Sequence, residues 1–110
     1  MTPKPVVLRA VARRDVDEAS AHYQKEGSVK VALGFIDALE GAFRHIAAHP
    51  ESGSPHYGHE LNLPGLRSWP LKRFPFLVFY MGGGSRIDVW RVLHSRRDIP
   101  EWMREEVEPD

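Results

Sequence analysis

Two amphipathic helical segments that meet at Gly27 and Ser28 restrict the fold of this chain more than any other feature. Before the junction, apolar residues recur at the spacing of one helix face: Ala12, Val16, Ala19 and Tyr23. After it, a second and more apolar helix is predicted from Val29 to Ala48, and Pro50 ends it. Gly27 can adopt the left-handed conformation that stops a helix, and the Ser28 hydroxyl can cap the next one. The sequence therefore predicts an antiparallel helical hairpin.

Short β-prone runs lie on both sides of this hairpin. One run precedes it and three follow the loop of residues 51–65: Val6–Leu8, then residues 66–74, Phe76–Met81 and residues 86–94. Pro70 interrupts the second run, and because proline cannot donate to a strand ladder, this run is expected to be an edge or bulged strand. Asp98 is placed to cap a short final helix over residues 101–107.

The chain is therefore predicted to fold as one α+β domain over residues 1–110. The helical hairpin packs on a mainly antiparallel sheet, in the order β-α-α-β-β-β with a short C-terminal helix. In the last strand, alternation predicts one face of Ile87, Val89, Arg91 and Leu93, and an opposite face of Asp88, Trp90, Val92 and His94. A semi-buried Arg91 needs an acidic partner. The candidates are Asp15, Asp37, Glu40 or an acid of another protein.

The net charge is zero, but the charges are unevenly distributed along the chain. Residues 67–97 hold seven Lys or Arg against one acid, a balance of +6, whereas residues 98–110 hold one Arg against six acids, a balance of −5. A basic segment of this kind indicates an acidic or polyanionic partner, or a solvated sheet face partly neutralised by its own tail.

Composition restricts the cellular compartment and the kinds of binding site that we expect for this chain. There is no cysteine, so disulfides and thiolate zinc sites are excluded and a reducing cytoplasm is expected. The longest apolar run, Phe76–Met81, is far shorter than the roughly 20 residues that cross a bilayer. His49, His56 and His59 share one loop but lack the spacing of a metal site. We therefore expect no membrane segment, no metal and no cofactor.

Three landmarks in this order resemble the RelE/ParE toxin superfamily. His49-Pro50 followed by Gly53 is similar to the HP-x-x-G element of ParE-like sequences. Leu66-Arg67 leading into residues 76–80 is similar to the family's LR … Y-x-I-x-Y hairpin, and residues 91–98 are similar to its R-V-L-H-x-x-R-D ending. That ending places Arg91, His94, Arg97 and Asp98 in the family motif. The ParE type is the member that the chain resembles most.

The resemblance implies the toxin of a type II toxin–antitoxin system of the plasmid-stabilisation kind, which causes growth arrest. It implies neutralisation by a ParD-like antitoxin and inhibition of DNA gyrase, with no direct sequence-specific DNA binding. An acidic, hydrophobic antitoxin segment that folds on docking would suit the basic sheet. The side chains expected to contact it are Arg67, Trp69, Arg73, Trp90, Arg91 and Arg97.

RelE-type members cut mRNA on the ribosome, and this is the alternative function. The chemistry requires proton transfer and cations to stabilise the phosphorane. Lys72, Arg73 and Arg91 could supply the cations and His94 the proton transfer, but no tyrosine follows Tyr80 to act as a late acid. His94 could instead be a strand-end residue bonded to Asp98 or to backbone. The sequence therefore favours inhibition by binding over RNA cleavage.

Overall fold

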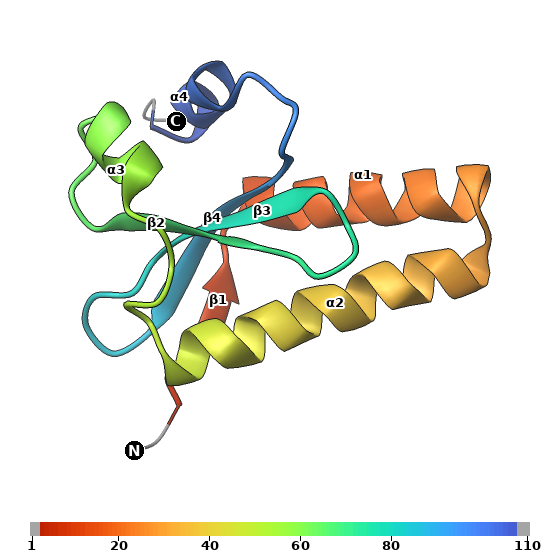
Figure 1. The fold of residues 1–110 in the computed structure, drawn as a ribbon, viewed down its shortest axis with the longest axis horizontal. Coiled ribbons are helices and arrows are strands. Elements are labelled where there is room, and N and C mark those ends of the chain that lie inside the picture. The colour runs from red at the N-terminus through yellow and green to blue at the C-terminus, as the bar shows by residue number, and fades with distance from the viewer. Residues whose placement is uncertain (1–2, 108–110) are drawn as a thin grey trace.

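A computed structural model of the chain describes residues 3–107. It contains eight elements in the predicted order, with one addition: β1 (Val6–Leu8), α1 (Ala10–Glu26), α2 (Val29–Ala48), α3 (His56–Glu60), β2 (Leu66–Pro70), β3 (Phe76–Met81), β4 (Ile87–His94) and α4 (Ile99–Val107). The addition is α3, which forms within the loop expected at residues 51–65. Figure 1 shows α1 and α2 running side by side, with α3 and α4 at the opposite side of the sheet.

The sheet is mixed and has four strands in the order β1-β4-β3-β2. The pairs β2–β3 and β3–β4 are antiparallel, and β1 pairs with β4 in parallel. The prediction of a mainly antiparallel sheet is therefore confirmed. The parallel pair is explained by the helical hairpin of α1 and α2, which carries the chain from β1 at one edge of the sheet to β2 at the other edge. Pro70 ends β2 at one edge of the sheet, as its missing N–H requires. No helix within residues 3–107 is long and apolar enough to span a membrane.

The junction between α1 and α2 confirms one prediction and corrects another. The Ser28 Oγ accepts a hydrogen bond from the Val31 N–H at 3.1 Å, as a serine N-cap should. Gly27, however, has φ −116°, which is not the left-handed conformation. A Cβ at this position would lie 2.9 Å from the Tyr23 carbonyl oxygen and 3.2 Å from the Val31 Cβ. Glycine is needed here because the two helices turn too tightly for a side chain.

A β-bulge in β4 corrects the predicted assignment of its faces. Phe79 pairs with Arg91 but the next residue, Tyr80, pairs with Val89, so Trp90 is one extra residue on β4. The alternation therefore inverts beyond the bulge. Val89 and Val92 pack in the same hydrophobic cluster, whereas alternation had placed them on opposite faces.

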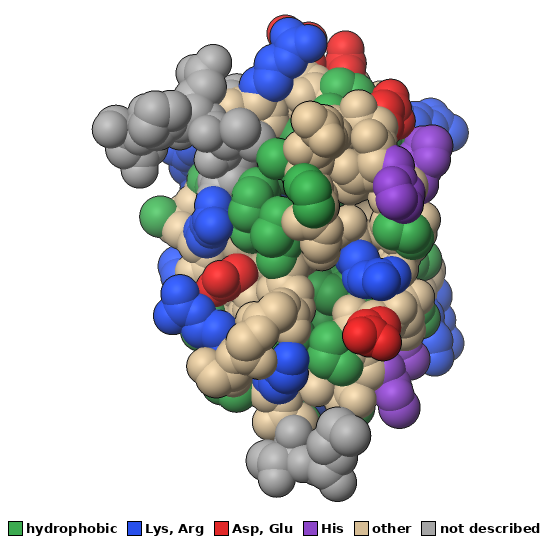
Figure 2. Space-filling model, turned by 90° about the vertical axis from the view of Figure 1, so that its left-hand side faces the viewer, with side chains coloured by type: hydrophobic (Ala, Val, Ile, Leu, Met, Phe, Trp, Pro, Cys, Tyr) green, Lys and Arg blue, Asp and Glu red, His purple; other side chains and the backbone are tan. Residues whose placement is uncertain are grey.

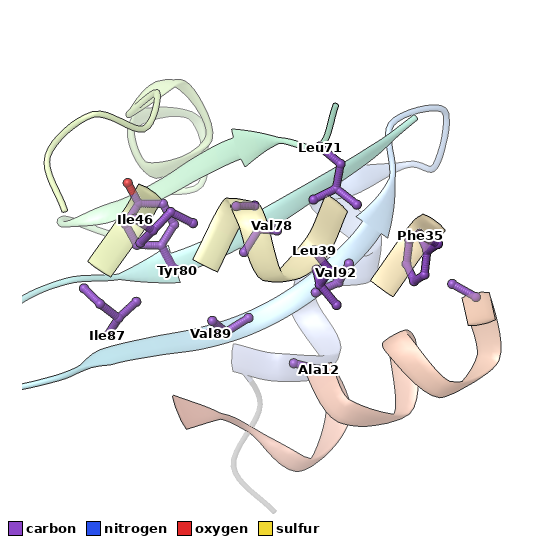
Figure 3. Close-up of a cluster of buried hydrophobic side chains, with 12 residues drawn as sticks. Ala12, Phe35, Leu39, Ile46, Leu71, Val78, Tyr80, Ile87, Val89 and Val92 are labelled. Atoms are coloured by element: carbon purple, nitrogen blue, oxygen red, sulfur yellow. The ribbon is translucent and has the colours of Figure 1, made fainter. Parts of the chain in front are cut away.

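Two hydrophobic clusters lie on the two faces of the sheet. The larger one fills the space between the sheet and the hairpin of α1 and α2, and Figure 3 shows side chains from all three parts pointing into it. Its fully buried members include Phe35, Ile46, Val78, Tyr80 and Ile87. The smaller cluster lies under α3 and α4, and its buried members are Leu66, Phe79, Leu93, Ile99 and Met103. Both short helices are therefore part of the packed structure.

Candidate functional site

Arg91 is the most buried charged side chain of the described chain, with 1% of its surface exposed. Its Nε and Nη2 donate to the two carboxylate oxygens of Asp15 in α1, each at 2.8 Å. Asp15 Oδ2 also accepts the backbone N–H of Val92 at 3.1 Å. Of the three internal partners considered from the sequence, Asp15 is thus the one found.

The third contact of this arginine reaches the C-terminal helix. Arg91 Nη1 donates to the Trp102 carbonyl oxygen of α4 at 2.8 Å. The guanidinium therefore joins α1, β4 and α4, and a bidentate pair of this kind is geometrically specific. With α4 in this position, the Arg91 side chain is inaccessible to RNA and to a partner protein. The contacts expected of Arg91 with an antitoxin or with a phosphorane stay predictions, which its burial in this structure does not favour.

His94 lies at the end of β4, half-buried, with its ring edge-on to Phe76 at a centroid distance of 5.3 Å. Its Nδ1 accepts the backbone N–H of Arg96 at 3.1 Å, which confirms the backbone alternative. Asp98 does not bind this ring; its Oδ1 accepts the Glu101 N–H at 3.3 Å and caps α4, as predicted. His94 also lines a cleft of about 260 Å³ that is bounded by α1, β4 and Trp102.

Four exposed cations gather at one end of the sheet. Lys72 and Arg73 lie in the connection between β2 and β3, and Arg96 and Arg97 lie in the connection between β4 and α4. The two connections touch, because the Ser95 N–H donates to the Pro75 carbonyl oxygen at 2.8 Å. The Arg97 guanidinium lies 4.1 Å from the centre of the Trp102 ring, a cation–π contact. We call these four residues the basic end.

The HP-x-x-G landmark is held by a buried tyrosine. The Tyr80 hydroxyl donates to the Pro50 carbonyl oxygen at 2.9 Å and accepts the Gly53 N–H at 3.0 Å. A Cβ on Gly53 would collide with this hydroxyl and would lie 2.9 Å from the Ser68 carbonyl oxygen. Burial raises the pKa of Tyr80 above its usual value of 10.0. Arg67 joins the same unit, since its Nη1 donates to the Gly53 carbonyl oxygen at 2.8 Å. Sequence reasoning had missed this role of Tyr80, and no local pattern indicates it.

The two tryptophans expected to anchor a partner are both half-buried. Trp69 stacks on the His45 ring at 4.1 Å, between α2 and the edge strand β2. Trp90 lies on the opposite face of the sheet, and the Arg9 guanidinium lies 4.2 Å from its centre. Figure 2 shows hydrophobic side chains in the middle of one face, with basic, acidic and His side chains around them. The structure therefore does not bring all the predicted contact residues onto a single surface.

The loop histidines do not form a metal site in the described structure. Across residues 3–107, no group of three His, Cys, Asp or Glu side chains is arranged to hold a metal ion. His49 ends α2, whereas His56 and His59 belong to α3, where His56 lies 3.2 Å from Glu60. The His49 ring also lies 5.2 Å from the His45 ring, so local contacts account for the side chains of His49 and His56.

Comparison with known proteins agrees with this geometry. A family described as "ParE toxin of type II toxin-antitoxin system, parDE" matches residues 6–99. A solved structure described as "Chromosomal ParDE TA system from P. aeruginosa" has the same fold, with a TM-score of 0.69 and 22% identity, over 83% of this chain and 95% of that one. None of the curated protein sequences matches. Because the family match spans both the HP-x-x-G loop and the ending of β4, this chain belongs to the ParE family of toxins of type II toxin–antitoxin systems.

Proposed function

We propose that this toxin acts in the cytoplasm by inhibiting DNA gyrase, and that a ParD-like antitoxin neutralises it by covering its basic and aromatic surfaces. The family match establishes the class of protein. The target and the mode of neutralisation are what the proposal adds.

The burial of Arg91 is the observation that carries the choice of mechanism. A ribonuclease of the RelE type would need its cations and its proton-transfer group around one phosphate. Here Arg91 is enclosed by Asp15 and α4, and the Nδ1 of His94 is occupied by a backbone N–H. Lys72 and Arg73 remain exposed at the basic end. The geometry therefore favours inhibition by binding to a protein target over cleavage of RNA.

The basic end supports the antitoxin part of the proposal. Its four exposed cations lie beside the half-buried Trp102, which combines charge with an aromatic surface. An acidic segment that is disordered when free can fold onto such a surface, because charge steers the encounter and aromatic side chains supply affinity. Trp69, Trp90 and Arg67 lie on other surfaces of the molecule, so an antitoxin that contacts them all would have to wrap around the toxin.

The target is tested with purified components. The toxin is added to DNA gyrase and relaxed plasmid, and in parallel to ribosomes that carry a labelled message. We expect loss of supercoiling and trapped cleaved DNA, with intact message. Cutting of the message together with normal supercoiling would overturn the gyrase proposal, and loss of that cutting in His94→Ala would then identify a ribonuclease.

The antitoxin surface is tested by charge reversal. Isothermal titration compares the wild-type toxin with the double variant Arg73→Glu and Arg97→Glu, and with Arg86→Glu as a control. Arg86 is an exposed arginine in the connection between β3 and β4, at the other end of the sheet. We expect the double variant to weaken antitoxin binding by at least tenfold and to reduce its salt dependence, and the control to change little. Equal affinities for all three proteins would contradict this placement of the antitoxin.

A further inference from the structure

The first turn of the basic end is anchored on both sides of its two cations. The Leu71 N–H donates to the Phe76 carbonyl oxygen at 3.0 Å, and the Leu71 side chain is buried in the larger hydrophobic cluster. Phe74 packs against the same cluster. Lys72 and Arg73 lie between these anchors and are exposed. The fold therefore holds the backbone of both cations in place.

The second turn is held by His94 and is joined to the first. The Nδ1 of His94 accepts the Arg96 N–H at 3.1 Å, and its carbonyl oxygen accepts the Arg97 N–H at 3.0 Å. The Ser95 N–H donates to the Pro75 carbonyl oxygen at 2.8 Å, which connects the two turns. The four cations of the basic end are thus presented by two turns in direct contact.

Arg73 adopts a backbone conformation that disfavours arginine. Its φ is 69°, in the left-handed region where a Cβ is strained. Within residues 3–107, the one other non-glycine residue with positive φ is Asn62, and asparagine tolerates this region better. Strain of this kind is concentrated at functional sites. A use for the Arg73 guanidinium explains the arginine better than the needs of the turn, which glycine would meet with less strain.

The acids of the described chain leave this positive charge uncompensated. Within residues 3–107, none of the four side chains forms an ion pair. Glu18 shares a cleft with Arg97, and Asp37 shares one with Lys72, but neither acid pairs with its neighbour. Asp98, the acid next to the second turn, caps α4. Four cations on fixed turns suit a ligand that carries several closely spaced negative charges.

We propose that the basic end binds the phosphate backbone of duplex DNA without reading its sequence. The inference rests on the proposed inhibition of gyrase, since a toxin that traps gyrase on cleaved DNA acts beside that DNA. The forked guanidinium of arginine matches phosphate oxygens, and contacts of this kind fix position but carry no sequence information. An antitoxin that covers the basic end would also block this contact.

Duplex DNA suits this surface better than single-stranded RNA does. Sequence-specific binding of single strands requires aromatic faces on which bases can stack. At the basic end, Phe74 and Phe76 pack against the larger cluster, and the Arg97 guanidinium lies over the Trp102 ring. The surface therefore offers charge without open aromatic faces, which matches a backbone and not unstacked bases.

The salt dependence of DNA binding tests the proposal without gyrase. Fluorescence anisotropy follows a labelled duplex of mixed sequence between about 25 and about 100 mM salt. Four neutralised phosphates give a log–log slope of about −3.6, so wild-type affinity should fall on the order of 100-fold. Lys72→Gln or Arg96→Gln should bind more weakly and fall only about 40-fold, since each leaves three contacts. Arg86→Gln is the control, because Arg86 is exposed at the other end of the sheet.

Three results of this titration would overturn the proposal. They are no binding at the lowest salt, a salt dependence that the two basic-end variants leave unchanged, and tighter binding of single-stranded RNA than of the duplex.

Arg73→Gly separates the role of the guanidinium from the stability of the turn. It should raise the unfolding temperature by about 2–4 °C, since strain is relieved while glycine adds freedom to the unfolded chain. It should also weaken DNA binding roughly tenfold at low salt. Arg73→Lys, which keeps the charge, should retain most of the affinity. A lower unfolding temperature in Arg73→Gly, with unchanged DNA affinity, would show that this arginine serves the fold and would contradict the inference.

A gyrase assay then distinguishes failure of the DNA contact from failure of the proposed function. In the absence of DNA, Lys72→Gln and Arg96→Gln should bind gyrase as tightly as the wild-type toxin does. With DNA present, they should trap less cleaved DNA. Equal trapping by the variants and the wild type, or an equal loss of gyrase binding without DNA, would overturn the DNA contact. If the wild-type toxin traps no cleaved DNA, the proposed inhibition of gyrase fails instead.

Discussion

Removing the carboxylate of Asp15 should destabilise this toxin more than any other single change to an acidic side chain of the described structure. In Asp15→Ala, the Arg91 guanidinium loses both bonds of its bidentate pair, and the Val92 N–H loses its acceptor. Arg91 cannot turn to water, since it is 1% exposed and α4 covers it. The variant therefore leaves a buried charge and a buried amide without their main partner.

The expected loss of unfolding free energy in Asp15→Ala follows from the burial of Arg91. Breaking a buried ion pair from one side costs about 3–5 kcal/mol, because the remaining charge stays desolvated. The unpaired Val92 N–H belongs to the same site, so its roughly 1–3 kcal/mol overlaps with this figure and is not added to it. A domain of this kind has about 5–15 kcal/mol of stability in total. Asp15→Ala should thus lose a large fraction of it.

Urea unfolding followed by tryptophan fluorescence measures the change. With a slope of about 1–3 kcal/mol per molar urea, the midpoint should fall by at least roughly 1 M. Asp17→Ala is the matched control, since Asp17 is exposed on the same helix and should change stability by less than about 0.5 kcal/mol. The double variant Asp15→Leu with Arg91→Met should be more stable than Asp15→Ala, because no buried charge remains. A loss below about 1 kcal/mol in Asp15→Ala, with an unchanged slope, would refute this account of the pair.

Three further changes test the rest of the structure. Tyr80→Phe should cost about 1–3 kcal/mol, since Gly53 and Pro50 lose their hydroxyl partner. Because burial raises the pKa of Tyr80, its contribution is complete below pH 10 and is lost as the pH rises above that value, so the stability of Tyr80→Phe should fall less steeply in alkali than that of wild type. Gly53→Ala should lower the unfolding temperature through its collision with Tyr80, whereas Gly83→Ala, which meets nothing within 4 Å, should not. Gly41→Ala should stabilise α2 by about 0.5–1 kcal/mol, because the added Cβ meets only Arg44 at 3.8 Å, and a thermal melt that shows no gain would contradict this.

Much of the fold could be predicted because its signals are local. The bounds of α2 and β3 follow from side-chain periodicity and from residues at their ends, such as Ser28 and Pro50. The predicted edge position of β2 also holds, because a missing N–H at Pro70 has the same consequence in any sheet. Helix α3 was missed because five residues with a weak apolar pattern carry little signal of their own.

The candidate site was predictable in its residue types but not in its geometry. Arg91, His94 and Asp98 could be recognised from their motif, and Asp15 could be named as one possible partner among three. In the structure, Arg91 is buried against α4, His94 binds a backbone N–H and Asp98 caps α4. These different roles depend on where α4 packs. That packing joins residues far apart in the chain, and no local pattern specifies it.

The sequence by itself determined every element except α3, their order, the charge distribution and the family motifs, since each depends on neighbours within a few positions. Only the tertiary structure decided which residues meet. The bulge at Trp90 inverts the faces of β4, and Asp15 reaches Arg91 across 76 positions of sequence. The two backbone hydrogen bonds that Ser68 exchanges with Ser54 are likewise a property of the assembled structure, because the partner of an amide can be identified only when all its possible partners are in place.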